Sequence, residues 1–417
     1  MTFENLGLSA DLLATVAREG YTEPTPVQSS AIPLILAGRD VVAAAQTGTG
    51  KTAAFVLPIL ELLRQHGNAG FSPARHPVRA LILTPTRELA VQVADAVKTY
   101  GKGQALRSMV VYGGTRIDPE VKMLWSGVEI LIATPGRLLD HVGQRSVNLS
   151  QVEILVLDES DRMLDMGFVP DVRKIVACIP GKRQTLLFSA TFSDDIRRLA
   201  GEFLTNAQTV EVAARNSIAD NLTQVLYPVD AERKADLLIH LIKRDQMEQV
   251  LVFTRSKIGA SRLASYLDRR GVSTSAIHGD RSQAERTRAL AAFKGRFVKV
   301  LVATDVASRG LDIEDLPYVV NYELPFEPQD YIHRIGRTGR AGASGTAISL
   351  VSPDEVDELR GVQRLLKKAI PCEVVEEFLP DPDREPAPAR RPGRSGASYS
   401  SGGRSGQGRP AFAASGR

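Results

Sequence analysis

The sequence predicts an α/β protein of two tandem domains, each a mostly parallel sheet with helices on both faces. At 417 residues the chain is longer than one hydrophobic core normally organises. Short apolar runs alternate with longer helical patterns along most of its length, which is typical of parallel sheets. The runs are nearly unbroken Val, Ile, Leu and Ala, as expected of strands buried on both faces.

The individual elements follow from these runs. In the first half, strands are expected at 41–44, 80–83, 108–111, 129–132, 154–157 and 185–188. In the second half they are expected at 250–253, 273–277, 300–302, 318–321 and 346–350, with helical patterns at 231–243, 261–270 and 283–293. The polar stretch 208–222 shows neither the hydrophobic repeat of a helix nor that of a strand, so it is the predicted linker. The first domain is therefore expected at 1–207 and the second at 223–380.

The C-terminal segment differs in composition from the rest of the chain. Pro, Gly, Ser and Arg dominate residues 381–417, so this tail is predicted to be disordered. Residues 386–417 contain six arginines and no acid, whereas the whole chain carries a net charge of +4. The remaining residues, 1–385, therefore carry −2. Because this net charge is close to zero, any nucleic-acid surface on the folded body must be a local patch of basic side chains.

Several classes of protein are disfavoured. No apolar run approaches the roughly 18 residues that a membrane span needs. The N-terminus carries Glu4 and Asp11 without a basic start, so it does not resemble a secretory signal. Cys178 and Cys372 lie far apart and suggest no disulfide framework, which favours the reducing cytoplasm. The six histidines form no metal-ligand spacing with cysteine, so no zinc site is expected.

Residues 45–52, AQTGTGKT, follow a predicted strand and open a helical pattern, the setting of a phosphate-binding loop. Glycines let backbone N–H groups approach phosphates, and the helix N-terminus attracts anions. Lys51 would reach the β- and γ-phosphates, and the Thr52 hydroxyl would hold Mg²⁺. The other residues expected to bind the nucleotide are Gln46, Thr47, Gly48, Thr49 and Gly50. A plain Gly-rich turn is the alternative on these eight residues alone.

Asp158 and Glu159 end the strand at 154–157. An acid at the carboxyl end of a buried strand lies in the crevice where such sheets bind ligands. Asp158 would bind Mg²⁺, directly or through water, and Glu159 would orient and deprotonate the attacking water. A solvated acidic turn is the alternative for this pair taken alone.

With these motifs in order, the sequence resembles the DEAD-box RNA helicases of superfamily 2 from Phe3 to about residue 370. GYTEPTPVQ, residues 20–28, resembles the family's adenine-reading Q motif, which implies ATP contacts for Phe3, Tyr21 and Gln28. The resemblance implies two RecA-like domains, ATP and Mg²⁺ as cofactors, and local separation of short RNA duplexes by domain closure.

PTRELA, Gly113-Gly114, TPGR, HGD with QAER, and ATDVASRGLD resemble the family's RNA-contacting motifs. The residues implied for RNA are Pro85, Thr86, Arg87, Gly113, Gly114, Thr134, Pro135, Gly136, Arg137, Gly279, Asp280, Gln283, Arg286, Thr304 and Arg309. Asp305 is implied to touch the ribose of ATP. SAT, at 189–191, resembles the coupling motif. The coupling residues implied are Asp161, Ser189, Thr191 and His333, the last reaching across the cleft to the Asp161 region.

HRIGRTGR, residues 333–340, is the most specific signal in the second half. Its four basic residues, at 333, 334, 337 and 340, are expected on one side of a helix start, and a solvated basic helix is the alternative. The resemblance implies that Arg337 and Arg340 act as arginine fingers on the γ-phosphate held by the other domain.

The family's name-giving tetrapeptide reads Asp-Glu-Ser-Asp here, with Ser160 where Ala is usual. The compact body and the Arg/Gly/Ser-rich end resemble the bacterial RhlE-type subgroup. Expected partners are single-stranded RNA, short duplexes and ribosomal or degradosome-type complexes, with no membrane, for a cytoplasmic monomer. A DNA translocase of the same fold and an ATP-gated RNA clamp with little unwinding are the alternatives.

Overall fold

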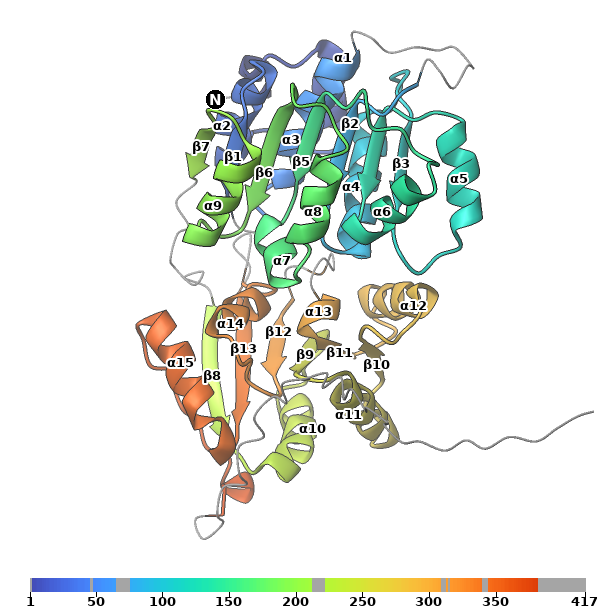
Figure 1. The fold of residues 1–417 in the computed structure, drawn as a ribbon. Coiled ribbons are helices and arrows are strands. Elements are labelled where there is room, and N and C mark those ends of the chain that lie inside the picture. Colours follow the sequence, from blue (N-terminus) through green and yellow to red (C-terminus); the bar gives the residue numbers. More distant parts are fainter. Residues whose placement is uncertain are drawn as a thin grey trace, which may run out of the picture.

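The computed structural model describes residues 2–45, 48–64, 76–211, 222–308, 313, 316–339 and 344–381. It contains two α/β domains, each built on one sheet, that lie one above the other in Figure 1. Every registered strand pair in both sheets is parallel, which confirms the predicted fold class. Among the described residues, no helix has the length and apolar character needed to cross a bilayer.

The first domain has a seven-stranded sheet of order β3-β4-β2-β5-β6-β1-β7. The strands are β1 Val41–Ala44, β2 Ala80–Leu83, β3 Ser108–Val111, β4 Ile130–Ala133, β5 Ile154–Leu157, β6 Gln184–Ser189 and β7 Gln208–Glu211. The helices are η1 Phe3–Leu6, α1 Ala10–Arg18, α2 Pro26–Leu36, α3 Lys51–Arg64, α4 Arg87–Tyr100, α5 Ile117–Trp125, α6 Pro135–Gly143, α7 Ser160–Asp165, α8 Val169–Val176 and α9 Asp194–Phe203.

Two apolar clusters cover the two faces of this sheet. Because successive strand side chains point to opposite faces, Ile82 packs in one cluster while Leu81 and Leu83 pack in the other. Helices α1 to α4 contribute to the first cluster, and α6, α8 and α9 contribute to the second. Burial on both faces explains why these strands are unbroken apolar runs.

The second domain has a six-stranded sheet of order β10-β11-β9-β12-β13-β8. The strands are β8 Leu222–Pro228, β9 Val250–Thr254, β10 Thr274–Ile277, β11 Val300–Thr304, β12 Tyr318–Asn321 and β13 Gly345–Val351. The helices are η3 Ala231–Arg233, α10 Lys234–Arg244, α11 Lys257–Arg269, α12 Gln283–Lys294, α13 Asp305–Ser308, α14 Pro328–Ile335, η4 Pro353–Glu355, α15 Val356–Leu366 and η5 Glu376–Phe378.

The predicted linker at 208–222 is wrong at both ends. Residues Gln208–Glu211 form β7, which pairs with β1 and completes the first sheet. Leu222 begins β8, which pairs with β13 along seven positions of the second sheet. Sequence periodicity missed β7 because it buries only Val210. Residues 212–221 and the tail at 382–417 lie outside the described residues.

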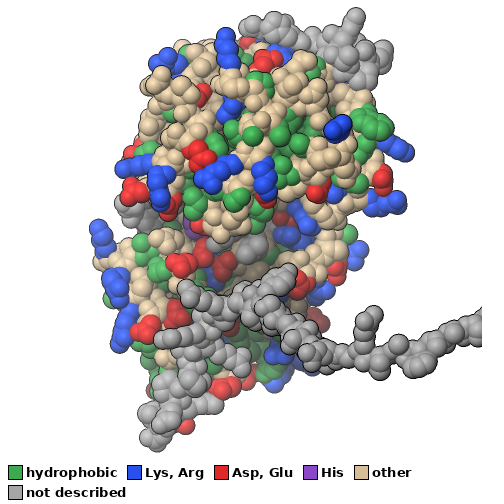
Figure 2. Space-filling view, viewed as in Figure 1, with side chains coloured by type: hydrophobic (Ala, Val, Ile, Leu, Met, Phe, Trp, Pro, Cys, Tyr) green, Lys and Arg blue, Asp and Glu red, His purple; other side chains and the backbone are tan. Residues whose placement is uncertain are grey.

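The junction between the domains lies at the carboxyl ends of the first domain's strands. Helix α7, which directly follows β5, lies beside α13 and α14 of the second domain in Figure 1. On the face shown in Figure 2, basic and acidic side chains are interspersed over both domains.

Candidate ATP and RNA site

The candidate phosphate site begins where β1 leads into α3. Gly48 and Gly50 adopt left-handed φ angles of 80° and 85°, which the absence of a side chain permits. Lys51 is the first residue of α3 and only 7% exposed, and its ammonium has no hydrogen-bond partner among the described residues. A buried ammonium without a partner is unfavourable by itself. The site therefore fits an anionic ligand such as a triphosphate.

Asp158 and Glu159 lie in a buried turn after β5. Burial raises the pKa of Asp158 to about 7, and the charge of Glu159 adds to this effect against the pull of Lys51. Glu159 has a left-handed φ of 51°, and its N–H donates to Asp158 Oδ1 over 2.9 Å. Its carboxylate accepts a bond from Arg162 at 2.7 Å. Arg162, which sequence reasoning missed, holds the predicted general base from one helical turn away.

Asp161 connects the acidic turn to the SAT segment. Its Oδ2 accepts from the backbone N–H groups of Ala190 at 3.0 Å and Thr191 at 3.2 Å. Burial favours the neutral acid, but Lys51, Arg162 and His333 outweigh it and hold the pKa of Asp161 below its ordinary value. His333 belongs to the second domain, so the structure brings the predicted coupling residues together across the junction. Ser189 Oγ joins them by accepting from the Thr191 N–H at 3.2 Å.

The Q motif touches the phosphate loop. Gln28 accepts from the Thr25 N–H at 2.9 Å in a capping box and donates its amide to the Gly50 carbonyl at 3.1 Å. A side chain on Gly50 would collide with this amide. One amide proton and one lone pair of Gln28 are left for other partners. The adenine-reading role stays a prediction.

The two predicted aromatic contacts of ATP lie in different surroundings. Tyr21 is about half exposed and lies 6.5 Å from Tyr100, centroid to centroid. Phe3 is buried in the apolar cluster beneath α1 to α3, where it packs the core. Stacking of Phe3 on the base therefore stays a prediction.

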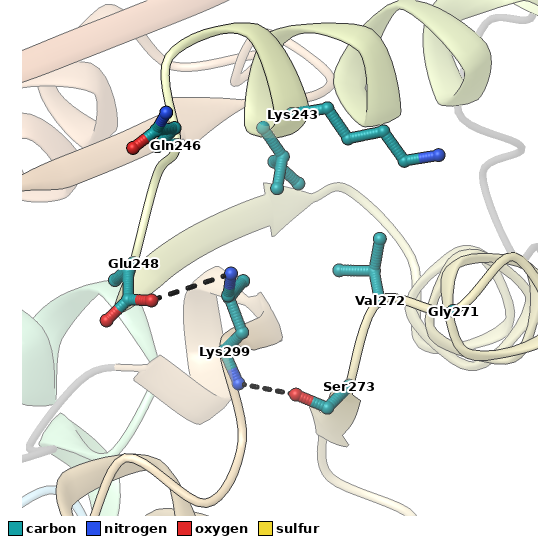
Figure 3. A pocket seen from close by; sticks show the side chains of 8 residues that line it. Lys243, Gln246, Glu248, Gly271, Val272, Ser273 and Lys299 are labelled. Carbon is teal, nitrogen blue, oxygen red and sulfur yellow. Dashed lines mark hydrogen bonds and ion pairs between the residues drawn. The ribbon is translucent and has the colours of Figure 1, made fainter.

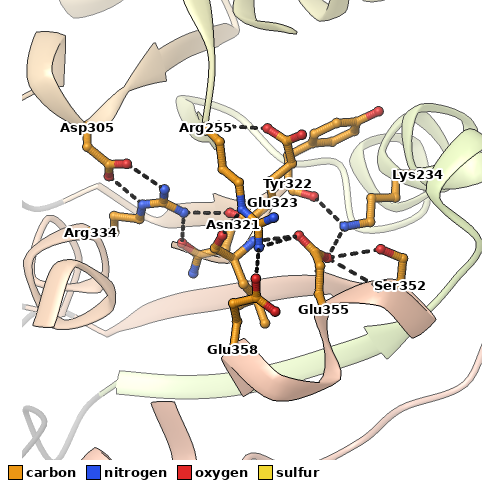
Figure 4. A network of polar contacts seen from close by, with 11 residues as sticks. Lys234, Arg255, Asp305, Asn321, Tyr322, Glu323, Arg334, Ser352, Glu355 and Glu358 are labelled. Carbon is orange, nitrogen blue, oxygen red and sulfur yellow. Dashed lines mark hydrogen bonds and ion pairs between the residues drawn. The ribbon is translucent and has the colours of Figure 1, made fainter. Parts of the chain in front are cut away.

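Asp305 of the second domain is held by Arg334 (Figure 4). The two side chains form a bidentate ion pair with distances of 2.6 and 2.7 Å, and Arg334 also donates to Asn321 at 3.1 Å. The guanidinium lies 5.0 Å from the ring centroid of Phe253. This bidentate pairing fixes the orientation of the Asp305 carboxylate.

The polar network of Figure 4 continues beneath Asp305. Glu355, only 2% exposed, accepts from the Leu324 N–H at 3.0 Å and pairs with the buried Lys234. Arg255 adds a 3.3 Å contact to the same carboxylate. Burial lowers the pKa of Lys234, although Glu355 opposes that shift. These buried charges are paired with one another, and their contacts with the backbone of Tyr322 and Leu324 fix the segment between β12 and α14, the helix that carries Arg334.

The predicted placement of HRIGRTGR at a helix start is wrong. Helix α14 starts at Pro328 and is capped by Gly336, so His333 and Arg334 lie in its last turn. Arg334 is 1% exposed and paired, not part of a solvated basic face. Arg337 follows the helix as a buried residue whose carbonyl accepts from the Leu316 N–H at 3.1 Å. The predicted contacts Gln46, Thr47, Arg309 and Arg340 lie outside the described residues.

PTRELA and Gly113-Gly114 lie against each other in the first domain. The Thr86 hydroxyl caps α4 by accepting from the Leu89 N–H at 3.3 Å. The Arg87 guanidinium lies so close to Gly114, which has a φ of 85°, that any side chain there would overlap it. Pro85 directly precedes Thr86, and Gly113 directly precedes Gly114. The structure therefore brings five predicted RNA residues to one place.

Arg137 of the TPGR motif is paired within the first domain, and its contact with RNA stays a prediction. It is 8% exposed, and its guanidinium donates to Glu120 at 2.8 Å and to the Thr115 hydroxyl at 2.8 Å. Glu120 also contacts His141 Nε2 at 2.8 Å. Arg137 therefore ties α6 to the loop that follows Gly114. Thr134 stands at the N-cap position of α6 without a side-chain capping hydrogen bond, and Pro135 and Gly136 lie in the first turn of the helix.

Two predicted RNA residues of the second domain contact the first domain, and their contacts with RNA stay a prediction. Gln283 donates to Glu88 of PTRELA at 3.1 Å, and Arg286 pairs with the same carboxylate at 2.9 Å. Sequence reasoning missed Glu88, because an acid in an amphipathic helix gives no sign of a distant partner. Of the other predicted RNA residues here, Asp280 pairs with Lys257, Gly279 lies against that lysine, and Thr304 is buried at the end of β11.

A separate cavity of about 510 Å³ opens at the amino ends of β9, β10 and β11 (Figure 3). Its lining includes Lys243, Ser273 and Lys299, and Lys299 pairs with Glu248 at 3.6 Å. It lies at the opposite end of the sheet from Asp305, so it is not part of the candidate ATP site. Within the described ranges, no group of three or more His, Cys, Asp and Glu side chains is placed to hold a metal ion.

The chain is similar to known proteins over most of its length. Residues 25–199 match the family model of the DEAD/DEAH box helicase, and residues 233–342 match the helicase conserved C-terminal domain. The DEAD-box ATP-dependent RNA helicase CshA of Geobacillus kaustophilus is 42% identical over 367 residues, which cover 88% of this chain and 77% of the relative.

Two solved structures are similar over nearly the same length. Yeast (S. cerevisiae) Dbp5 bound to RNA and ADP BeF3 is 32% identical with a TM-score of 0.79, covering 90% of this chain and 95% of Dbp5. A DEAD box protein of the hyperthermophile Methanococcus jannaschii is 39% identical with a TM-score of 0.51, covering 89% and 99%. Given a relative this similar over most of both sequences, the chain belongs to the DEAD-box ATP-dependent RNA helicases.

Proposed function

We propose that this RNA helicase hydrolyses ATP in a site completed by domain closure, and that closure on RNA releases one strand of a short duplex. The proposal rests on the buried ammonium of Lys51, which has no hydrogen-bond partner among the residues that the structure describes. It lies close enough to Asp158 and Asp161 to act on the pKa of both acids. A γ-phosphate at this position would supply the partner that Lys51 lacks.

The acidic turn and the start of α3 would hold the metal. The Thr52 hydroxyl and Asp158 are the expected protein ligands, and Mg²⁺ characteristically takes few protein ligands together with phosphate oxygens. When bound, Mg²⁺ would neutralise charge on the β- and γ-phosphates. Glu159 would accept the proton of the attacking water, with its carboxylate aimed by the 2.7 Å contact to Arg162.

The second domain would complete the site. Arg337 and Arg340 are the proposed fingers on the γ-phosphate, and Asp305 is the proposed ribose contact. This structure is more similar to Dbp5 bound to RNA and ADP BeF3, with a TM-score of 0.79, than to the more identical Methanococcus protein, with a TM-score of 0.51. This supports a domain arrangement like that of the RNA-bound protein. If ATP and RNA both favour closure, each must tighten the binding of the other.

The proposed RNA path runs over the carboxyl ends of both sheets. In the first domain, Arg87 and the backbone at Gly113-Gly114 and Thr134–Gly136 would contact phosphates, which gives grip without base reading. Arg309 and Thr304 would extend the path over the second domain. Arg137 and Arg286 take supporting roles, since their guanidinium groups are paired with acids.

The finer assignments are separate proposals. An RhlE-type subgroup is supported by the Arg/Gly/Ser-rich tail, although the Geobacillus relative is named CshA. A cytoplasmic location is supported by two exposed cysteines with free thiols, Cys178 and Cys372. Ribosomal or degradosome-type complexes and a monomeric state complete the proposal, and both can be tested by purification from cells under native conditions.

The test compares ATP turnover and strand release. The wild-type chain should hydrolyse ATP faster with single-stranded RNA and release a strand from short RNA–RNA duplexes but not from DNA–DNA duplexes. Lys51→Ala should lose ATPase activity, and Glu159→Gln should trap long-lived complexes with ATP and RNA. Full turnover by Lys51→Ala would refute the phosphate site. RNA retention on a non-hydrolysable ATP analogue without strand release would favour the ATP-gated clamp.

A further inference from the structure

The serine that replaces the family's usual alanine makes contacts that an alanine cannot make. Ser160 is the first residue of α7 and is fully buried. Its hydroxyl lies 3.0 Å from the carbonyl oxygen of Leu157 and 3.1 Å from that of Phe188. Leu157 ends β5 and Phe188 belongs to β6, so one hydroxyl donor is shared between two neighbouring strands.

The Phe188 carbonyl lies one step beyond the paired part of the two strands. The β5–β6 register ends at Leu157↔Leu187, because the chain turns at Asp158, whose N–H donates to Leu83 on the far side. Ser189 accepts from the Ala45 N–H on β1, so the preceding carbonyl, on Phe188, points toward β5. The Ser160 hydroxyl therefore donates to the Phe188 carbonyl at a position where β5 no longer offers a backbone N–H.

The next residue makes a second link in the same direction. Asp161 accepts from the N–H groups of Ala190 and Thr191, two and three residues after Phe188, whose carbonyl Ser160 binds. Ser160 and Asp161 thus attach the acidic turn to residues 188–191 by consecutive contacts. With alanine at position 160, only the second link would form.

We propose that Ser160 is a positioning residue that locks the SAT segment to the Asp158–Asp161 turn and strengthens the coupling of ATP hydrolysis to RNA. The inference rests on the proposed roles of Asp161 and Ser189–Thr191. Ser160 lies too deep to contact ATP or RNA, and it acts through the strand ends that it joins. A single neutral hydrogen bond of this kind corresponds to a change of about two- to ten-fold in a rate.

Ser160→Ala tests the inference, with Ser146→Ala as a matched control. Ser146 is also buried, 5% exposed against 0% for Ser160, and its hydroxyl lies within hydrogen-bond distance, 2.8 Å, of His141 Nδ1, away from the ATP site. Both variants should lose similar thermal stability, because each loses one buried hydroxyl. Only Ser160→Ala should lower the ratio of RNA-stimulated to RNA-independent turnover and the strands released per ATP, each about three- to ten-fold. The KM for ATP should change less than two-fold, and Ser160→Cys, a weaker donor, should be intermediate.

Two results would overturn the inference. One is a Ser160→Ala protein with wild-type RNA stimulation and wild-type strand release per ATP. The other is an equal loss of both quantities in Ser160→Ala and Ser146→Ala, which would show a general stability effect. A wild-type chain without RNA-stimulated turnover would contradict the proposed function itself, so the two failures are distinguishable.

Discussion

Glu88 and Arg286 offer a direct measure of how strongly the two domains are held together. Their side chains are 8% and 10% exposed, and the carboxylate and guanidinium lie 2.9 Å apart across the junction. Charge pairs at such desolvated interfaces couple by about 1.5–7 kcal/mol. We take about 2–3 kcal/mol for this pair, because burial lowers the pKa of Arg286 and so offsets part of the attraction. The interaction between Glu88 and Arg286 should therefore raise the equilibrium constant for domain closure by about 30- to 150-fold.

The chain provides its own probes for this measurement. Cys178 lies in the first domain and Cys372 in the second, both exposed and free, so a donor and an acceptor dye can report closure by energy transfer. Closure would be titrated with RNA at saturating non-hydrolysable ATP analogue for the wild type, Glu88→Ala, Arg286→Ala and the double variant. Each single variant should require about 30- to 150-fold more RNA for half-closure, and the double variant little more than either single one.

A specific pattern in this cycle would refute the reasoning. If the two single substitutions add fully in the double variant, the carboxylate and guanidinium do not interact in the closed state. Glu88→Gln separates charge from hydrogen bonding, because its amide oxygen can still accept from Gln283 and Arg286. It should recover part of the loss caused by Glu88→Ala.

Three further predictions concern single elements. Glu120→Ala leaves Arg137 buried without its acid and should cost about 3 kcal/mol in the free energy of unfolding, measured by urea denaturation; an unchanged midpoint would contradict the pairing. Arg334→Ala should cost a similar amount and raise the KM for ATP several-fold, because Asp305 loses its bidentate partner; an unaltered KM would remove Asp305 from the ATP site. A chain ending at residue 380 should keep RNA-stimulated turnover but bind RNA more weakly, with the log–log salt slope lower by up to about 4. Equal slopes would assign the tail another role.

The sequence predicted those elements that many residues encode together. Strands such as β2 and β5 lie at their predicted positions because four consecutive buried apolar residues leave few alternatives. β7 was missed because a strand at the sheet edge that buries only Val210 carries almost no periodic signal. The loop between β1 and α3 was also predicted correctly, because its turn requires glycine at positions 48 and 50, where φ is positive.

Partners across space were beyond the reach of sequence reasoning. The basic spacing of HRIGRTGR suggested one charged helix face, but Gly336 ends α14 and Arg334 turns inward to Asp305. The arginine of TPGR looked available for phosphate until the structure placed Glu120 beside it. An arginine in a motif shows only that a negative charge is nearby, and that charge can belong to a ligand or to the protein itself.

This distinction explains how closure can depend on ligands. The pair Arg162–Glu159 lies within the first domain, so it forms whether the cleft is open or closed. The pair Arg286–Glu88 exists only when the domains meet, and its contribution of about 2–3 kcal/mol is modest beside the cost of ordering two domains. A body with a net charge near zero supplies no long-range attraction to add to it. The triphosphate, drawn to Lys51 and the proposed fingers, must therefore contribute much of the free energy of closure. Once the γ-phosphate leaves, that contribution is lost, and we expect the contacts of Arg286 and Gln283 with Glu88 to be too weak by themselves to keep the RNA enclosed.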